Sequence, residues 1–168
     1  TGVSYLNGTS LGAVDYGETG SVDGSAWSFP GQDSVADQVV RSQCGRVLAD
    51  TLTDGAASYP SVYSYDGAGR LTQAVIPDHV LSYGFGAASC GADADAGMDG
   101  NRTSYEDLHT SGGSTVNDTT VDYCYDWADR LTGTTVSDAP AGAGELLSPL
   151  TATGPGASLA YDARGALT

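Results

Sequence analysis

Apolar residues along this chain come in short stretches that alternate with clusters of Gly, Asp, Asn and Pro. Apolar segments at 3–6 and 26–29 stand between such clusters, and 74–85 holds two apolar stretches broken by a Pro-Asp pair. Residues 115–125 alternate between apolar and polar positions, as a half-buried strand does. No window has a sustained helical period with caps at both ends, and residues 143–150 allow one helical turn at most. The pattern therefore predicts an all-β fold of short strands joined by tight turns.

Composition and charge exclude several classes of protein. The 168 residues suffice for one ordinary domain, and 24 Gly against 2 Phe and 1 Met favour turns over a large aliphatic core. The 6 basic residues are all Arg, and 21 acidic residues, mostly Asp, bring the formal net charge to -15. This charge repels nucleic-acid phosphates and anionic membrane surfaces, so neither is an expected partner. The chain has no long apolar run or signal-peptide pattern, and it begins at Thr1, so we expect a fragment of a longer protein.

One pattern, Tyr-Asp-x-x-x-Arg-Leu-Thr, recurs along the chain. Full copies occupy residues 65–72 and 125–132, and a third copy at 161–168 has Ala in the Arg position. Shorter variants stand at 45–47 and 100–103. Internal repetition indicates an array of similar units rather than a domain built around one site. The repeat therefore refines the predicted fold to an array of antiparallel β-hairpins.

The residue types of the repeat suit a hairpin turn. Tyr65 fits the end of a strand, and Asp66 can open the turn by accepting an N–H two residues on. Gly69 can adopt positive φ and form a bulge as the chain returns, and Arg70 can then pair with Asp66. In an array, each Tyr is expected to lie over a residue of the next hairpin. We expect the repeats to be defined by Tyr65, Asp66, Gly69, Arg70, Gly100, Arg102, Tyr125, Asp126, Arg130, Tyr161 and Asp162.

These segments resemble the YD repeats of Rhs and teneurin-type proteins, in an actinobacterial style. The resemblance covers residues 38–168, with a Gly/Pro/Ala-rich insertion at about 139–156, and residues 1–37 are expected to continue the same shell as hairpins. It implies a large shell of spiralling hairpins that encloses a toxin domain in bacterial members and presents an adhesion surface in others. The self-cleaving Asp-Pro segment of some members does not occur in this sequence, and no toxin domain is evident.

Three cysteines raise the question of a disulfide. None has zinc-ligand spacing. We favour a bridge between Cys90 and Cys124, because neighbouring hairpins could bring them together, and Cys44 would then be left over. Three buried free thiols are the alternative. A bridge would imply an oxidising, extracellular setting.

Other candidate chemistry has simpler explanations. Asp93, Asp95 and Asp99 place oxygen ligands at alternate positions, as calcium loops do, but a solvated Asp/Gly loop is the favoured interpretation. His79 and His109 neighbour no nucleophile motif and are interpreted as surface residues. We therefore expect no enzyme activity and no cofactor. Two tryptophans, at 27 and 127, are expected to pack within the sheet, although a sugar-stacking platform is the alternative.

Together these observations predict a structural segment of a secreted or cell-surface protein, part of a β-shell that encapsulates or presents an effector domain. The alternative is an adhesion or carbohydrate-binding module that uses exposed aromatics. Expected partners are other repeats of the parent chain or identical copies, and an encapsulated toxin domain. Open strand edges also predict self-association of the isolated segment.

Overall fold

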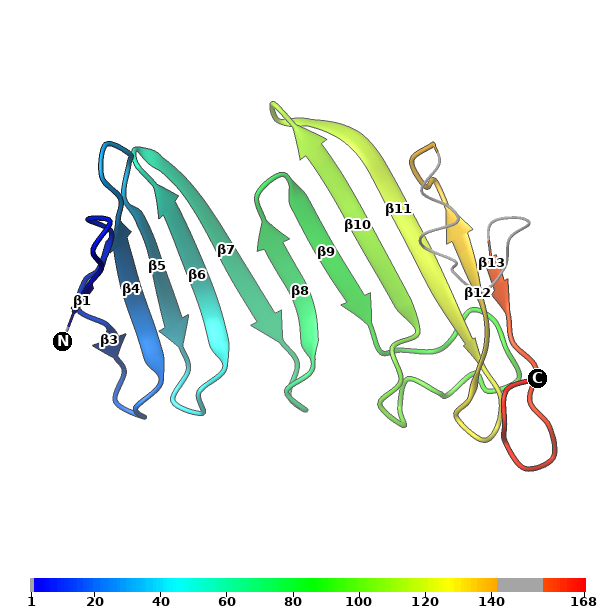
Figure 1. Ribbon diagram of the computed structural model, residues 1–168. Coiled ribbons are helices and arrows are strands. Elements are labelled where there is room, and N and C mark those ends of the chain that lie inside the picture. Colours follow the sequence, from blue (N-terminus) through cyan, green and yellow to red (C-terminus); the bar gives the residue numbers. More distant parts are fainter. Residues whose placement is uncertain (1, 142–155) are drawn as a thin grey trace. The chain divides into compact units, whose positions relative to one another are not determined.

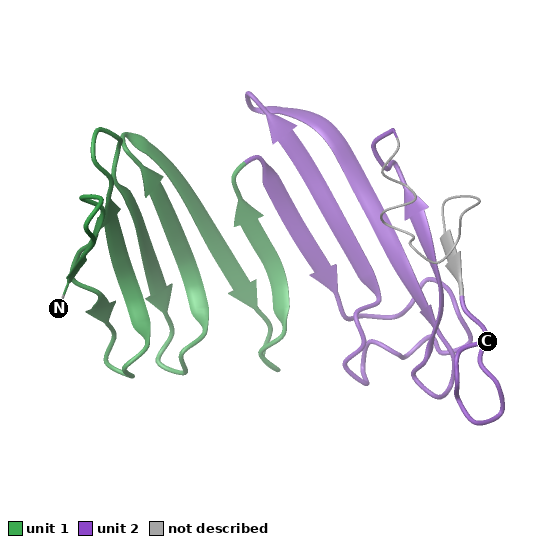
Figure 2. Ribbon diagram, in the orientation of Figure 1, with its two compact units in different colours: residues 1–77 green, residues 78–168 purple. Residues whose placement is uncertain are grey.

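The computed structural model describes residues 2–141 and 156–168, and this part of the chain contains strands and turns but no helix. The all-β prediction is therefore confirmed. None of the described segments is a helix that could cross a membrane. The chain forms two compact units, residues 1–77 and 78–168 (Figure 2). Their boundary follows Pro77, inside the region 38–168 that resembles the repeats.

Unit 1 is an antiparallel sheet of successive hairpins (Figure 1). Its strands pair in the order β1-β2-β4-β5-β6-β7-β8, and the short β3 pairs with β4. The strands are β1 (Val3–Ser4), β2 (Ser10–Leu11), β3 (Asp15–Tyr16), β4 (Val22–Ser28), β5 (Val35–Arg41), β6 (Val47–Asp54), β7 (Ala57–Tyr65) and β8 (Leu71–Ile76).

Unit 2 is likewise built of antiparallel strands, which pair in the order β9-β10-β11-β12-β13. Its strands are β9 (His79–Gly84), β10 (Ser104–Ser111), β11 (Ser114–Tyr125), β12 (Leu131–Ser137) and β13 (Gly156–Ser158). The strands expected on either side of Pro77 and at 115–125 are thus present. Between β9 and β10 the chain leaves the sheet over residues 85–103 (Figure 1). The predicted insertion at 139–156 and the helical turn at 143–150 lie almost wholly outside the described residues.

Few apolar side chains are fully buried in the described ranges. Unit 1 has Ala74, and unit 2 has Ala96, Val121 and Val136. Sequence explains this distribution, because short strands rich in Ser, Thr and Asp offer little apolar surface to bury. The sheets must therefore draw much of their order from backbone pairing and from contacts at the turns.

Candidate functional site

The same five-residue turn occurs six times in the part of the chain that the structure describes. In each turn the first N–H donates to the fifth carbonyl, and the fourth N–H donates to the first carbonyl, at 2.8–3.0 Å. The fourth residue has φ between 57° and 84°. These turns begin at Tyr5, Gly17, Ser42, Asp66, Asp126 and Asp162. The prediction that the Tyr-Asp repeats are tight reversals of common geometry is therefore confirmed.

A bulge accompanies four of these turns. The pairing register shifts just before the turns that start at Gly17, Ser42, Asp66 and Asp126. This is the geometry of a type I turn followed by one left-handed residue, for which Gly is the usual choice. Asp129 takes that position in one copy, with φ 57°, as its tolerance of left-handed backbone allows.

Sequence comparison alone missed two copies of the turn. The turns at Tyr5 and Gly17 lack the Asp and Arg of the repeat, and only the fourth-position Gly8 and Gly20 mark them. The variant around Gly100 is only partly similar. Its N–H donates to Gly97 at 3.2 Å with φ 98°, but this turn lies in the 85–103 excursion and joins no paired strands.

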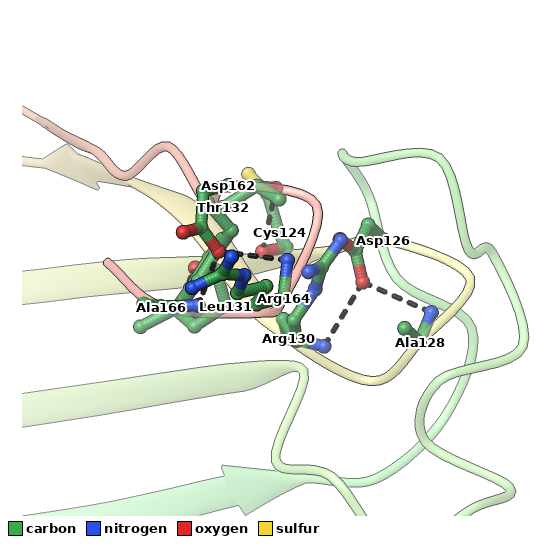
Figure 3. Close-up of polar contacts among 10 residues, drawn as sticks. Cys124, Asp126, Ala128, Arg130, Leu131, Thr132, Asp162, Arg164 and Ala166 are labelled. Atoms are coloured by element: carbon green, nitrogen blue, oxygen red, sulfur yellow. Dashed lines mark hydrogen bonds and ion pairs between the residues drawn. The ribbon is translucent and has the colours of Figure 1, made fainter. Parts of the chain in front are cut away.

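The aspartates hold the turns through their carboxylates, as Figure 3 shows for two copies. Asp126 accepts the N–H of Ala128 at 2.9 Å and the N–H of Arg130 at 3.1 Å. Its second oxygen accepts Nε of Arg130 at 2.8 Å. These contacts, the Arg130 side chain first, lower the pKa of Asp126. The expected capping of the turn by its Asp is thus present, and it extends to the residue four positions on.

The other two copies show what the arginine adds. Asp66 accepts the Arg70 N–H at 2.9 Å and its Nε at 2.7 Å, which is the pairing expected from the sequence. These bonds lower the pKa of Asp66, with the backbone N–H the largest cause. Asp162 accepts the N–H groups of Arg164 and Ala166 at 2.8 and 2.9 Å, with no guanidinium in the fifth position. The turn therefore forms without the ion pair.

Two tyrosines connect a repeat turn to the turn before it. The Tyr65 hydroxyl donates to the carbonyl of Val47 at 2.8 Å, and the Tyr161 hydroxyl donates to Leu131 at 2.8 Å. The preceding arginine lies over the same ring, with Cζ 5.8 Å from the Tyr65 centroid for Arg46. For Arg130 and Tyr161 the distance is 4.8 Å. Such cation–π contacts add electrostatic attraction to the hydroxyl bond.

This direction corrects the expectation that each Tyr lies over the next hairpin. Tyr65 ends β7, which pairs with β6, and β6 begins at Val47 directly after the preceding turn. On its other side, β7 pairs with β8, whose first residue follows the turn of Tyr65 itself. The preceding turn is thus the neighbouring turn that the side chain can reach.

Among the described residues, Arg102 contacts three aromatic rings, whereas Arg46 and Arg130 each contact one. Its guanidinium lies 4.8 Å from the Tyr123 ring, 5.5 Å from Tyr83 and 6.0 Å from Tyr105, and its Nη2 donates to the Tyr123 hydroxyl at 3.0 Å. The Tyr125 hydroxyl donates to the Arg102 carbonyl at 3.0 Å. Burial, followed by the charge of Asp107, raises the pKa of Tyr105 to about 12. The sequence identified Arg102 as a repeat position but not the three rings, which come from three different strands.

A disulfide joins Cys90 to Cys124, the pairing favoured from the sequence, with Cα atoms 4.9 Å apart. It fastens the 85–103 excursion to the end of β11, beside the turn that starts at Asp126. The N–H groups of Ala92 and Asp93 reinforce this by donating to the Tyr125 carbonyl at 2.8 and 3.1 Å. Cys44 is a free, exposed thiol in the 42–46 turn.

The suggested calcium ligands are only partly brought together. Carboxylate oxygens of Asp93 and Asp99 lie within 4.8 Å of each other and of Asp129, which comes from the 126–130 turn. Asp95 is not in this group, and its N–H donates to Asp93 at 2.9 Å. Asn101 Nδ2 donates to Asp129 at 2.7 Å. An acidic cluster of this kind is common at exposed loops, and we base no proposal on it.

The tryptophan and histidine side chains match expectation only in part. Trp27 is half-buried and stacks on Tyr5 with centroids 6.2 Å apart, consistent with packing in the sheet. Trp127 is 78 % exposed in the 126–130 turn, so the packing interpretation is wrong for this residue. The two histidines are half-buried and lie together, because β9 and β10 place His79 opposite His109.

No known protein family matches the chain, and no curated protein matches it. Among solved structures, the chain is similar to a Tc holotoxin pore of Photorhabdus luminescens, at 12 % identity and a TM-score of 0.46. The match covers 98 % of this chain and 11 % of that chain, so it spans about a tenth of the larger protein. At this identity and TM-score the likeness is not evidence of family or function.

Proposed function

We propose that this chain is a non-catalytic wall segment of a secreted or cell-surface protein of the Rhs/YD-repeat type. In this role it forms part of a β-shell that encloses or presents an effector or toxin domain. The partners are then other repeats of the parent chain, or identical copies, and the enclosed domain. The observation that carries the proposal is the recurring turn whose Tyr bonds to the turn before it.

That link supports a wall because it is directional and repeatable. Tyr65 reaches back to Val47, and Tyr161 reaches back to Leu131, with the same hydroxyl-to-carbonyl bond of 2.8 Å. Each new hairpin can therefore attach to the preceding one by the same contact, in addition to the strand pairing. An array built in this way extends through contacts between neighbouring hairpins, as in other repeat proteins. The disulfide supports an extracellular location, where such bonds persist.

Protease protection in the full-length natural protein tests the proposal. Substituting Arg102 by Ala together with Tyr125 by Phe removes the side-chain hydrogen bonds and ring contacts that, beside the disulfide, hold the 85–103 excursion against the strands, and should loosen the wall locally. We expect faster cleavage of regions outside the wall than in the parent protein. Arg164→Ala is the matched control, because its side chain makes no described polar contact. Equal cleavage rates for the parent protein and the double variant would contradict an enclosing role.

A second candidate function rests on Trp127, which is the most exposed tryptophan and stands at the tip of the 126–130 turn. An exposed indole can stack on a sugar ring or on a partner protein. Binding to a glycan array that is lost in Trp127→Ala, but kept in Trp27→Phe, would favour an adhesion module. No binding by the unmodified chain would exclude this sugar-binding alternative.

A further inference from the structure

His79 and His109 stand opposite each other on β9 and β10. The neighbouring pair carries a backbone bond, in which the Thr110 N–H donates to the Asp78 carbonyl at 2.7 Å. Backbone-bonded pairs alternate along antiparallel strands, so the two histidines form the intervening pair, whose side chains lie closer together. Their imidazole rings are stacked, with centroids 4.5 Å apart and planes 9° from parallel.

A carboxylate fixes one of the rings. Asp107 lies two residues before His109 on β10 and therefore on the same face of the sheet. Its Oδ1 is 2.7 Å from Nδ1 of His79. Because an ionised carboxylate only accepts hydrogen bonds, Nδ1 is the donor, and the lone pair of a neutral His79 ring lies on Nε2. Within residues 2–141 and 156–168, no other hydrogen bond to either imidazole is found.

We propose that His79 and His109 form a binding site for a divalent transition-metal ion of the zinc, copper and nickel class, with Asp107 as the positioning residue for His79. Imidazole nitrogen suits these ions, whereas Ca²⁺ and Mg²⁺ take oxygen ligands. A carboxylate that accepts the other N–H of a ligating His is the usual outer partner at such sites. Side chains of His79 and Asp107 remain 33 % and 26 % exposed, so an ion and its waters can reach them.

Binding of one ion requires both rings to turn out of the stacked arrangement. Two imidazoles that bind one tetrahedral ion at 2.0–2.1 Å hold their ligating nitrogens about 3.3 Å apart. Rings whose planes are 9° apart keep their lone pairs in nearly parallel planes, so both side chains must rotate about χ1 and χ2 for the two Nε2 atoms to converge on one ion. The facing positions allow this, because side chains of such a pair lie close together across the strands. Water completes the coordination. The net charge of -15 also favours a cation over a neutral or anionic ligand. Bound metal would connect β9 to β10 and stabilise the folded form of unit 2.

Copper electron paramagnetic resonance of the full chain, prepared without a histidine tag, tests this inference without any substitution. Cu²⁺ added at one equivalent should show coupling to two imidazole nitrogens. A spectrum with oxygen ligands only, or with one nitrogen, would overturn the proposal, because the acidic clusters or a single ring would then hold the ion.

Substitutions distinguish a metal site from a packing pair. Asp107→Asn should weaken Cu²⁺ affinity by about 10- to 100-fold, the usual effect of losing an outer carboxylate, and His79→Ala or His109→Ala should weaken it further. Asp99→Asn, which removes an exposed carboxylate of the other cluster in unit 2, should leave the affinity unchanged. Circular dichroism checks that each variant is folded. Unchanged Cu²⁺ affinity in a folded His109→Ala variant would show that the stacked rings are a packing contact only.

Discussion

The two units hold their hairpins together by different contacts. In unit 1, hairpins follow one another without interruption from β4 to β8, and the turns at Ser42 and Asp66 are connected through Arg46 and Tyr65. In unit 2, the 85–103 excursion interrupts the hairpins, and there the chain adds a disulfide, three buried apolar residues and an arginine among three tyrosines. Short, regular connections can be held by local bonds. A long excursion costs more chain entropy and is tied down by other means.

Removing the disulfide should produce the largest difference between the units. The bridge spans 34 positions, and closing such a loop stabilises the folded state by about 3–4 kcal/mol. In the Cys90→Ser, Cys124→Ser double variant we expect faster hydrogen exchange in β10 and β11 and unchanged exchange in β5 and β6. Mass spectrometry of peptides from each strand measures this. Equal acceleration in both units would mean that their stabilities are not separate.

The fourth residue of the turn is Gly69 in one copy of unit 1 and Asp129 in one copy of unit 2, and both have positive φ. Gly69 has φ 84°, and a β-carbon there would also have to displace the Arg46 guanidinium. Gly69→Ala should destabilise the protein by about 1–2 kcal/mol, because Ala disfavours left-handed backbone. Gly69→Asn should cost less, since Asn visits this region more readily. Urea midpoints of the two variants give the order, and the reverse order would contradict a backbone cause.

Arginine contacts should have a somewhat smaller effect. Arg102→Ala removes three ring contacts and one hydrogen bond, with an expected cost of about 1–2 kcal/mol. Arg46→Ala, which removes one ring contact in unit 1, should cost about 0.5 kcal/mol. Arg164→Ala serves as the control with little change. A larger effect at Arg46 than at Arg102 would show that the number of ring contacts does not determine how much an arginine contributes to folding stability.

Lowering the pH should change the contribution of two kinds of aspartate to folding stability in opposite directions. A hydrogen bond with Asp37, then burial, raises the pKa of Asp50 in unit 1, and its Oδ1 is a buried oxygen without a partner. The folded state then holds this proton more tightly than the unfolded state. The contribution of this proton to folding stability is fully present below the pKa of the unfolded state, and it is lost as pH rises through the pKa of the folded state. Asp50→Asn should therefore stabilise unit 1 at neutral pH and make little difference in acid.

The turn aspartates supply the contrasting case. The pKa values of Asp66 and Asp126 are lowered, so their contribution is full above the unfolded value of 3.8 and is lost as pH falls through the folded values. The free energy of unfolding is measured as a function of pH for Asp50→Asn, Asp126→Asn and the parent protein. The differences between each variant and the parent protein should show opposite trends with pH. Parallel trends would contradict the assigned directions.

How far the sequence could predict the structure depends on the range of each contact. The repeat turns were predictable, because Asp66, Gly69 and Arg70 determine them within five residues. The tyrosine partners, the histidine pair and the joining of Asp129 to Asp93 depend on which strands lie side by side and in what register. Spacing along the chain contains little of that information. The exposure of Trp127 was missed for a related reason, since a turn tip has no neighbouring strand to cover it.

The central claim is that the repeat tyrosines Tyr65 and Tyr161 each contact the turn before their own. Nuclear Overhauser contacts in the isolated chain test it most directly. The account predicts contacts from the Tyr65 ring to Arg46 and Val47, and from the Tyr161 ring to Arg130 and Leu131. Contacts of both rings confined to residues of their own turns would contradict it.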